Sequence, residues 1–172
     1  MRATSALVVS PDGIHNAVTT APIRHVLIVP RSTLVDFGLQ LGDLRENIVV
    51  DDTGIGDIHD LPSGTVLGIN GVLIRLTVHC EPCGRLAHVL ANPKSVEHKR
   101  GYLGTFLTGG ELHIGDPIRV RGKQYEAVPY DLRERIVWCL NLNPASRATQ
   151  KSPEALPTGP RRAILGLTLK PH

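Results

Sequence analysis

Hydrophobic positions along this chain fall in short runs that are separated by glycine- and proline-containing turns. The first run, residues 23–29, is rich in β-branched residues and lies between two prolines, which predicts a strand. Residues 65–78 hold two apolar segments joined by Asn70-Gly71, the strongest short-range signal for a β-hairpin. In the second arm, apolar and polar residues alternate from Ile74 to Val78, which predicts a strand with one buried face.

Similar runs continue on both sides of this hairpin. Residues 46–52 predict another strand, and residues 102–128 predict several short strands separated by glycine turns. Many short strands with glycine turns are typical of a closed or nearly closed antiparallel β-barrel. Helical patterns are confined to Ser32–Leu39 and Asp131–Leu142, so the expected fold class is mostly β with a few short helices. The expected turns lie at Gly109-Gly110, Gly115-Asp116 and Arg121-Gly122.

The chain has the size of one domain. With 172 residues and 41% hydrophobic content, it can bury one sizeable core. We expect residues 1–128 to form the barrel and residues 129–142 to form a helix. Residues 143–172 hold five prolines and little periodicity, which predicts a poorly ordered tail. Whether that tail ends in a strand at Ala163–Leu169 is left open.

Charge and cysteine content narrow the class of protein. The 19 basic and 16 acidic residues give a net charge of +3, and aromatic residues make up 3% of the chain, so no nucleic-acid partner is expected. The first apolar run is too short for a signal peptide and no later run approaches a membrane span, so we expect a cytoplasmic protein without a membrane partner. Three cysteines, an odd number, argue for reduced thiols.

Two of these cysteines, Cys80 and Cys83, follow directly after the predicted hairpin. Their spacing matches the C-x-P-C dithiol of thioredoxin-like proteins, but those proteins place the pair between a strand and a long helix, whereas strands and turns surround it here. A zinc site would need a second pair of ligands. The candidates His98, His113 and Cys139 lack the spacing of such a pair.

The sequence around Cys83 favours a reactive sulfur. Thiolate is the reactive form of cysteine, and nearby positive charge stabilises it. Arg85 follows two residues later, and His79 and His88 are close in sequence. Cys83 can equally be a small buried hydrophobe, as most cysteines outside active sites are. The spacing leaves both interpretations open for Cys83 and favours packing for Cys139, which lies on the apolar face of its predicted helix.

Five stretches follow one another along the chain: GDLRENIVV (42–50), LPSGTVLGI (61–69), EPCGRL (81–86), KRGYLG (99–104) and GGELHIGDPI (109–118). Taken in order, these motifs resemble the MOSC domain, which is named for the C-terminal domain of molybdenum cofactor sulfurase. The resemblance runs from about Ile23 to Val120. It implies a β-barrel with a single diagnostic cysteine, which in this sequence is Cys83.

The resemblance implies two roles for Cys83. It carries sulfur as a persulfide, or it ligates molybdenum in the pterin-based molybdenum cofactor. In some relatives the sulfur comes from a pyridoxal-phosphate cysteine desulfurase, and other relatives reduce N-hydroxylated compounds at molybdenum. No desulfurase domain fits in this chain, so pyridoxal phosphate would belong to a partner desulfurase, and an electron-transfer protein is the other expected partner. Enzymatic activity, as a molybdenum-dependent reductase or a sulfur transferase, is left open.

Cofactor contacts are expected from residues near these motifs. A pterin phosphate needs cationic or amide donors. Arg45 and Arg100 can serve there or form structural ion pairs, and Asn47 can hydrogen-bond the pterin edge or cap a turn. The alternatives to a MOSC-like role are a dithiol redox protein that uses Cys80 with Cys83, and a barrel-shaped binding module without chemistry. The candidate cofactor-binding residues are Arg45, Asn47, Arg85, Arg100 and Gly101.

Overall fold

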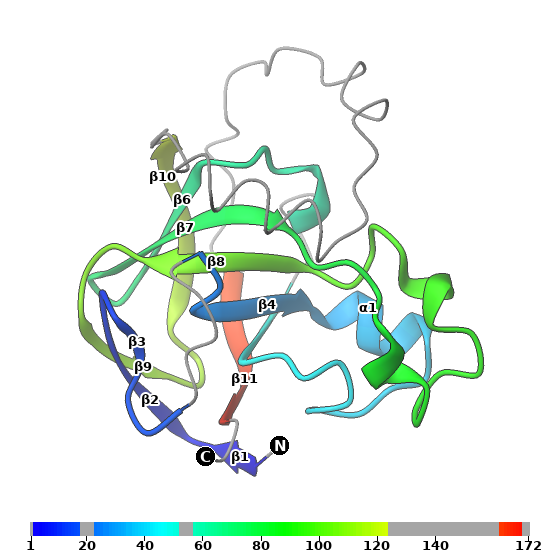
Figure 1. The fold of residues 1–172 in the computed structure, drawn as a ribbon. Coiled ribbons are helices and arrows are strands. Elements are labelled where there is room, and N and C mark those ends of the chain that lie inside the picture. The colour runs from blue at the N-terminus through cyan, green and yellow to red at the C-terminus, as the bar shows by residue number, and fades with distance from the viewer. Residues whose placement is uncertain (1, 18–22, 52–56, 124–161, 170–172) are drawn as a thin grey trace.

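The structure, a computed structural model, describes residues 2–17, 23–51, 57–123 and 162–169. Its main strands form a ring of hydrogen-bonded neighbours, which closes where the strand at residues 162–169 pairs with the strand at residues 48–50 (Figure 1). In spatial order the ring runs through β5 (Ile48–Val50), β4 (Val26–Pro30), β8 (Tyr102–Phe106), β7 (Val72–His79), β6 (Thr65–Ile69), β10 (Pro117–Lys123) and β11 (Arg162–Leu169). All of these pairings are antiparallel except the parallel pairing of β4 with β5. The predicted mostly β fold with a barrel-like ring of strands is therefore confirmed.

The predicted hairpin is formed by β6 and β7. Asn70 has φ 46° and Gly71 has φ 82°, so both central residues of the turn adopt the left-handed conformation that a two-residue type I′ turn requires. The turn sets the register, in which Ile69 lies opposite Val72. The alternation predicted for the second arm is confirmed from Ile74 to Leu76, because both of these residues are fully buried and Arg75 between them is half-buried. It is wrong at Thr77, which is buried, and at Val78, which is half-buried, because the pairing of β7 with β8 shifts register between Leu76 and His79.

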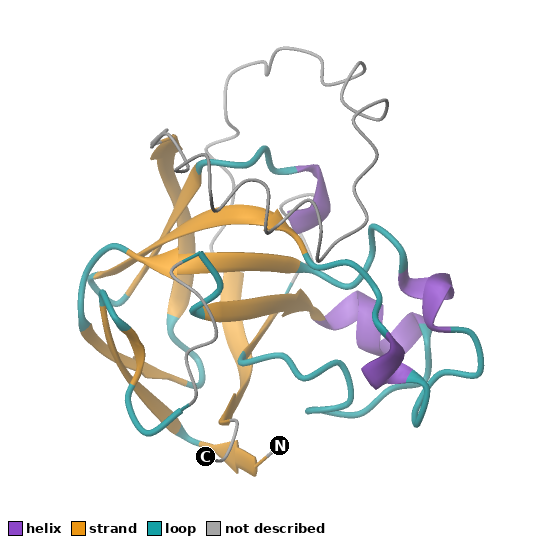
Figure 2. Cartoon of the chain, in the orientation of Figure 1, coloured by secondary structure: helices purple, strands orange, loops and turns teal. Residues whose placement is uncertain are grey.

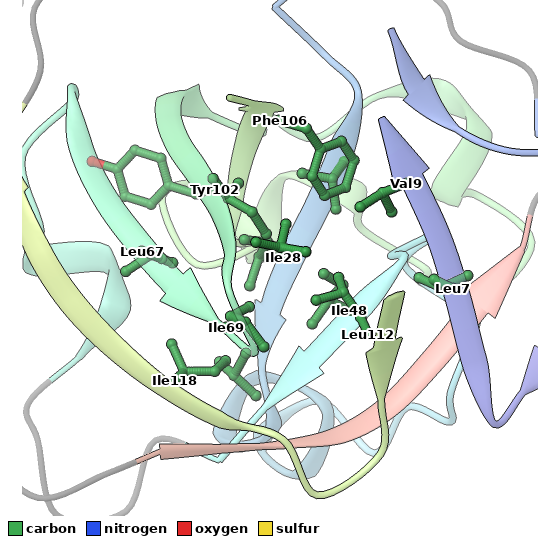
Figure 3. Close-up of a cluster of buried hydrophobic side chains, with 14 of the residues drawn as sticks. Leu7, Val9, Ile28, Ile48, Leu67, Ile69, Tyr102, Phe106, Leu112 and Ile118 are labelled. Atoms are coloured by element: carbon green, nitrogen blue, oxygen red, sulfur yellow. The ribbon is translucent and has the colours of Figure 1, made fainter. Parts of the chain in front are cut away.

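Aliphatic side chains from the inner faces of the strands fill the barrel. Ile28, Ile48 and Ile69 belong to this main core and are fully buried (Figure 3). Tyr102 is one of its aromatic members, but its hydroxyl points away from the other labelled side chains. That hydroxyl donates a hydrogen bond to the Leu61 carbonyl at 2.5 Å, so the tyrosine connects the core to the loop before β6.

The N-terminal residues form strands that the hydrophobic pattern did not reveal, namely β1 (Arg2–Thr4), β2 (Ala6–Ser10) and β3 (Gly13–Ile14). β2 lies between β3 and β9 (Gly110–His113) in a small antiparallel sheet, and β1 pairs with β11 of the barrel. Leu7 and Val9 of β2 reach the same core as the barrel strands. β1 and β2 are short, and β11 and β9, with which they pair, lie far away in sequence, so local periodicity is a weak signal for them.

Short helices lie against one side of the barrel (Figure 2). They cover a second apolar cluster on the outer face of β4, to which Leu27 and Val29 contribute. The helix expected near Ser32–Leu39 is present at Arg31–Asp36, but no side chain caps it, and the Thr33 hydroxyl donates instead to the Lys99 carbonyl at 2.8 Å. The helical elements are α1 (Arg31–Asp36), η2 (Gly84–Leu86) and η3 (Pro93–Val96), with η1 (Ile58–Asp60) in the loop before β6.

The turn expected at Arg121-Gly122 is wrong. β10 continues through both residues, and its pairing with β6 shifts register between Val120 and Gly122. This shift is a β-bulge, in which glycine adopts a conformation that other residues rarely reach, with φ 152° at Gly122. Glycine in this stretch therefore marked a bulge inside a strand and not the end of the strand.

The tail expected at 143–172 is corrected for one segment. Arg162–Leu169 form β11, which pairs with β1, β5 and β10. The prolines of this interval lie outside the strand, so they do not interrupt its ladder. The helix expected at 129–142 and the rest of the interval lie outside the described residues. None of the helices in the described ranges has the length and apolar character that a membrane-spanning helix needs.

Candidate functional site

Cys83 lies on an exposed loop that leaves the barrel at the end of β7. The Cys80 amide donates to the Gly101 carbonyl at 2.8 Å, which ties the start of this loop to the start of β8. Cys83 itself has extended backbone angles and occupies the position before η2, where its carbonyl accepts from the Leu86 amide at 3.0 Å. Its side chain is exposed, whereas Cys80 is half-buried against the outer apolar cluster.

A buried arginine contacts the loop that carries Cys83. Arg100 is only 6% exposed. Its Nη1 donates to the Glu81 carbonyl at 2.8 Å and lies 3.6 Å from the Cys83 sulfur, while its Nη2 donates to the Leu44 carbonyl at 3.0 Å. The guanidinium therefore joins two loops that are far apart in sequence and places a permanent positive charge beside the thiol.

These surroundings lower the pKa of the Cys83 thiol. Partial burial acts in the opposite direction and raises the pKa, but the main-chain N–H of Arg85, the charge and hydrogen bond of Arg100, and the charge of Arg85 together outweigh it. A thiol that is both exposed and stabilised as thiolate is a nucleophile and a soft metal ligand. Among the cysteines that the structure describes, Cys83 has this combination and the half-buried Cys80 does not.

Asn47 and Gly101, two of the expected cofactor contacts, have structural roles in the scaffold. Asn47 is 3% exposed, and its side-chain Oδ1 accepts a hydrogen bond from the main-chain N–H of Leu27 at 3.0 Å. The main-chain N–H of Asn47 donates to the Leu27 carbonyl at 2.9 Å. Gly101 has φ 107°, and a Cβ there would lie 2.2 Å from the Ile28 carbonyl oxygen. Asn47 therefore hydrogen-bonds to β4, and the lack of a side chain at Gly101 lets the two backbones pass close together, roles that the sequence interpretation had not assigned to them.

Arg45 and Arg85 remain available for an anionic ligand. Arg45 comes directly after Leu44, and the Leu44 carbonyl accepts a hydrogen bond from Arg100. Arg85 lies in η2, two residues after Cys83, and is exposed. Within the described ranges, neither guanidinium has an ion pair or a side-chain hydrogen bond with another residue. Arg100 thus joins the two loops on which the thiolate and both of these cations are carried.

A cluster of histidines lies at the same end of β7, and the sequence gave no signal for it as a cluster. The His79 ring packs on the Tyr102 ring at a centroid distance of 4.0 Å. The His59 ring is nearly parallel to the His79 ring, with 6.2 Å between the ring centroids. The His98 ring meets the His79 ring edge-on, with 6.3 Å between the centroids. His59 lies in η1, His79 ends β7 and His98 lies in the loop before β8, so no local spacing connects the three histidines.

Burial controls the ionisation of this cluster. It lowers the pKa of His79 to about 4, with further lowering from the neighbouring His59 and His98, against a smaller raising effect of Asp57. Burial also raises the pKa of Tyr102 to about 12, with Asp60 adding to the effect, and raises the pKa of the Glu81 carboxyl. Near neutral pH the centre of the cluster is therefore an uncharged imidazole on an uncharged phenol.

The described part of the chain holds no group of three or more histidine, cysteine, aspartate or glutamate side chains placed to bind a metal ion. In the described ranges, an exposed thiol that is stabilised as thiolate lies beside a buried arginine at one end of a β-barrel. The MOSC domain model matches residues 16–119, and the chain belongs to the MOSC domain family.

Solved structures of low sequence identity share this fold. The YuaD protein of Bacillus subtilis is 18% identical, with a TM-score of 0.57 over 70% of this chain and 87% of that chain. YiiM of Escherichia coli is 14% identical, with a TM-score of 0.58 over 83% of this chain and 82% of that chain. YiiM of Geobacillus stearothermophilus is 18% identical, with a TM-score of 0.53 over 72% of this chain and 67% of that chain. The curated proteins contain no match to the sequence.

Proposed function

We propose that this MOSC protein binds the molybdenum cofactor and that the Cys83 thiolate is the protein ligand to molybdenum. The observation that carries the proposal is the contact between Cys83 and Arg100, whose Nη1 lies 3.6 Å from the sulfur. The guanidinium favours ionisation of an exposed sulfur without blocking its outer side. Membership of the MOSC family supports this assignment, because MOSC domains are associated with the cofactor.

The side chains around Cys83 fit such a group in chemical type. Thiolate suits a soft or high-valent metal centre. The phosphate of the pterin needs cationic donors, and Arg45 and Arg85 carry guanidinium groups that are not engaged with other described side chains. The terminal nitrogens of Arg100 donate to main-chain carbonyls, so we assign Arg100 to support of the thiolate and not to the phosphate.

When bound, the cofactor would supply two-electron redox chemistry. The contribution of the chain is to hold Cys83 as a thiolate, to orient it through the bonds of Arg100, and to contact the phosphate through Arg45 and Arg85. An electron-transfer partner would then supply the electrons. We expect the protein to work in the cytoplasm as a reductase of N-hydroxylated compounds.

A persulfide carrier is the second candidate, and the exposure of Cys83 favours it. In this chemistry the thiolate attacks the outer sulfur of a donor persulfide, R–S–SH. The new S–S bond forms on Cys83, the S–S bond of the donor breaks, and R–S⁻ leaves. The donor would be a cysteine desulfurase, and pyridoxal phosphate would be bound by that partner.

The test is the metal and sulfur content of protein expressed in a host that makes molybdenum cofactor. We expect molybdenum and pterin in the wild type, neither in Cys83→Ser, and near-normal content in Cys80→Ala, a matched control in the same loop. A wild type without molybdenum that takes up cyanide-labile sulfur on Cys83 would favour the carrier. Equal loss of function in both variants, with a reversible Cys80–Cys83 disulfide, would favour the dithiol alternative.

A further inference from the structure

Glu46 carries a fully buried carboxyl group in the loop before β5. Glutamate is almost never fully buried unless its carboxyl group is paired, so its place here calls for an explanation. The carboxyl oxygens accept main-chain hydrogen bonds from Gly42, Leu44 and Glu46 itself. Burial raises the pKa of the Glu46 carboxyl, and these hydrogen bonds act in the opposite direction. The side chain of Glu46 is therefore bound to the backbone of its own loop, residues 42–46.

Residues 42–46 form a tight turn whose backbone needs such support. The main-chain N–H of Arg45 donates to the Gly42 carbonyl at 3.0 Å, which closes the turn. Arg45 has φ 61°, in the left-handed region that residues with a side chain rarely adopt. Main-chain N–H groups that converge within such a turn form a concave site for a negative group. In this protein the Glu46 carboxyl group fills that site from within the chain.

Leu44 connects this buried carboxyl group to the site of the thiol. Its main-chain N–H donates to Glu46, and its carbonyl accepts from the Nη2 of Arg100 at 3.0 Å. The other terminal nitrogen of Arg100, Nη1, donates to the Glu81 carbonyl at 2.8 Å and lies 3.6 Å from the Cys83 sulfur. Because a guanidinium group is rigid and planar, the position of the Leu44 carbonyl restricts where Nη1 lies.

The guanidinium of Arg100 has few anchors besides this carbonyl. Its Nε is buried and has no hydrogen-bond partner in the described part of the chain. Apart from the sulfur, the Leu44 and Glu81 carbonyls are the acceptors that the described residues offer to its terminal nitrogens. Loss of the Leu44 contact would therefore free one end of the guanidinium and allow its charge to move away from the sulfur.

We propose that Glu46 is a positioning residue for the Cys83 thiolate. It holds the Leu44 carbonyl in the place where that carbonyl orients Arg100 toward the sulfur. The inference rests on the proposed function, in which Cys83 acts as a thiolate. Glu46 itself is fully buried and bonded to its own loop, so it acts through Arg100 and is not a group that meets a ligand.

The direction of the change at Cys83 distinguishes this role from a direct effect of charge. A carboxylate that acted by its charge would disfavour a nearby thiolate, so its removal would lower the pKa of the Cys83 thiol. A carboxyl group that keeps Arg100 in place favours the thiolate, so its removal should raise the pKa of the Cys83 thiol. The charge and the main-chain N–H of Arg85 also lower that pKa, so the increase should be partial.

The test follows the alkylation of Cys83 by iodoacetamide against pH in protein without added cofactor, with the Cys83 peptide quantified by mass spectrometry. Glu46→Ala should move the pH of half-maximal rate upward by at least about 0.5 unit. Glu46→Gln should move it in the same direction, because an amide NH2 group replaces one of the accepting oxygens. In an Arg100→Gln background, Glu46→Ala should add no further shift, because its effect passes through Arg100. A shift of equal size in both backgrounds would overturn the proposal.

Asp43→Asn is the matched control. Asp43 is an acidic residue of the same loop, and its Oδ2 accepts from the main-chain N–H of Gln40 at 2.8 Å, so it supports a different part of the backbone. Its alkylation profile should match that of the wild type. Urea unfolding shows whether each variant is folded, and Glu46→Gln decides if Glu46→Ala does not fold. An unchanged or lowered pH of half-maximal rate in folded Glu46→Gln would overturn the proposal.

The alkylation profile separates this inference from the proposed function, because it needs no molybdenum. A wild type that holds no molybdenum after expression in a host that makes the cofactor would refute the proposed function, and the profiles would still decide the role of Glu46. A wild type that holds molybdenum, with equal profiles for wild type and folded Glu46→Gln, would retain the proposed function and overturn the positioning role.

Discussion

Acid should destabilise this protein through His79, and replacing His79 with phenylalanine should remove that contribution. The pKa of His79 is about 4 in the folded protein and 6.5 in an ordinary exposed histidine. As the pH falls from about 6.5 to 4, the unfolded chain therefore binds a proton that the folded chain does not bind. Folding stability falls across this interval and is fully retained above it.

The size of the effect follows from the pKa difference. The difference between a pKa of 6.5 and one of about 4 corresponds to roughly 3 kcal/mol of folding free energy. Because the ring is partly exposed, we expect a smaller effect of about 1–2 kcal/mol. Phenylalanine keeps the ring contact with Tyr102, which lies 4.0 Å away, and does not titrate. His79→Phe should therefore lose about 1–2 kcal/mol less stability than the wild type between pH 7 and pH 4.5.

Urea unfolding at a series of pH values measures this difference directly. Subtracting the two stability curves cancels the other groups, including His25, whose pKa burial lowers, and Glu46, whose pKa burial raises. His113→Gln serves as a control and should follow the wild type. Parallel curves for wild type and His79→Phe over this pH range would show that His79 is not held neutral by the fold.

Three further predictions concern the thiolate, the scaffold and the barrel. Alkylation of Cys83 by iodoacetamide should have its half-maximal rate below the pH of an ordinary cysteine, and Arg100→Gln should move it upward; an unchanged profile would remove Arg100 from the site. Gly101→Ala should cost at least about 2 kcal/mol in urea unfolding, because its Cβ would meet the Ile28 carbonyl at a backbone φ of 107°, whereas Gly84→Ala, which has open space, should cost far less. Deleting residues 162–172 should abolish cooperative thermal unfolding, and a melting temperature near that of the full chain would show that β11 is dispensable.

The parts of the fold that the sequence predicted are those encoded locally. The hairpin of β6 and β7 could be found because Asn70-Gly71 specifies the turn and the alternation in β7 specifies its buried face. Cys83 could be singled out because the charge that favours its ionisation includes Arg85, two residues away. For its second supporting cation, Arg100, the sequence left a ligand contact and a structural ion pair open, because the position of Arg100 beside the sulfur depends on the barrel.

The parts that could not be predicted depend on distant segments. His59, His79 and His98 meet only because η1, β7 and the loop before β8 end at the same place. The parallel pairing of β4 with β5, and the pairing of β11 with three strands, are likewise properties of the closed ring. Arg121-Gly122 shows a related limit, because a glycine can mark a bulge or a turn and only the partner strand decides between them.

Closure of the ring by β11 sets an order on folding during synthesis. Arg2 lies opposite Leu169, and Ile48 lies opposite Leu167. β1 and β5 therefore cannot pair with β11 until it has been translated, more than a hundred residues later. Until then β5 and β10 each expose an edge whose main-chain N–H and C=O groups are unpaired, and such edges promote aggregation of nascent β proteins. We expect the barrel to complete its hydrogen bonding only after Leu169 has left the ribosome. Such long-range pairing slows folding and makes the growing chain a natural client for chaperones.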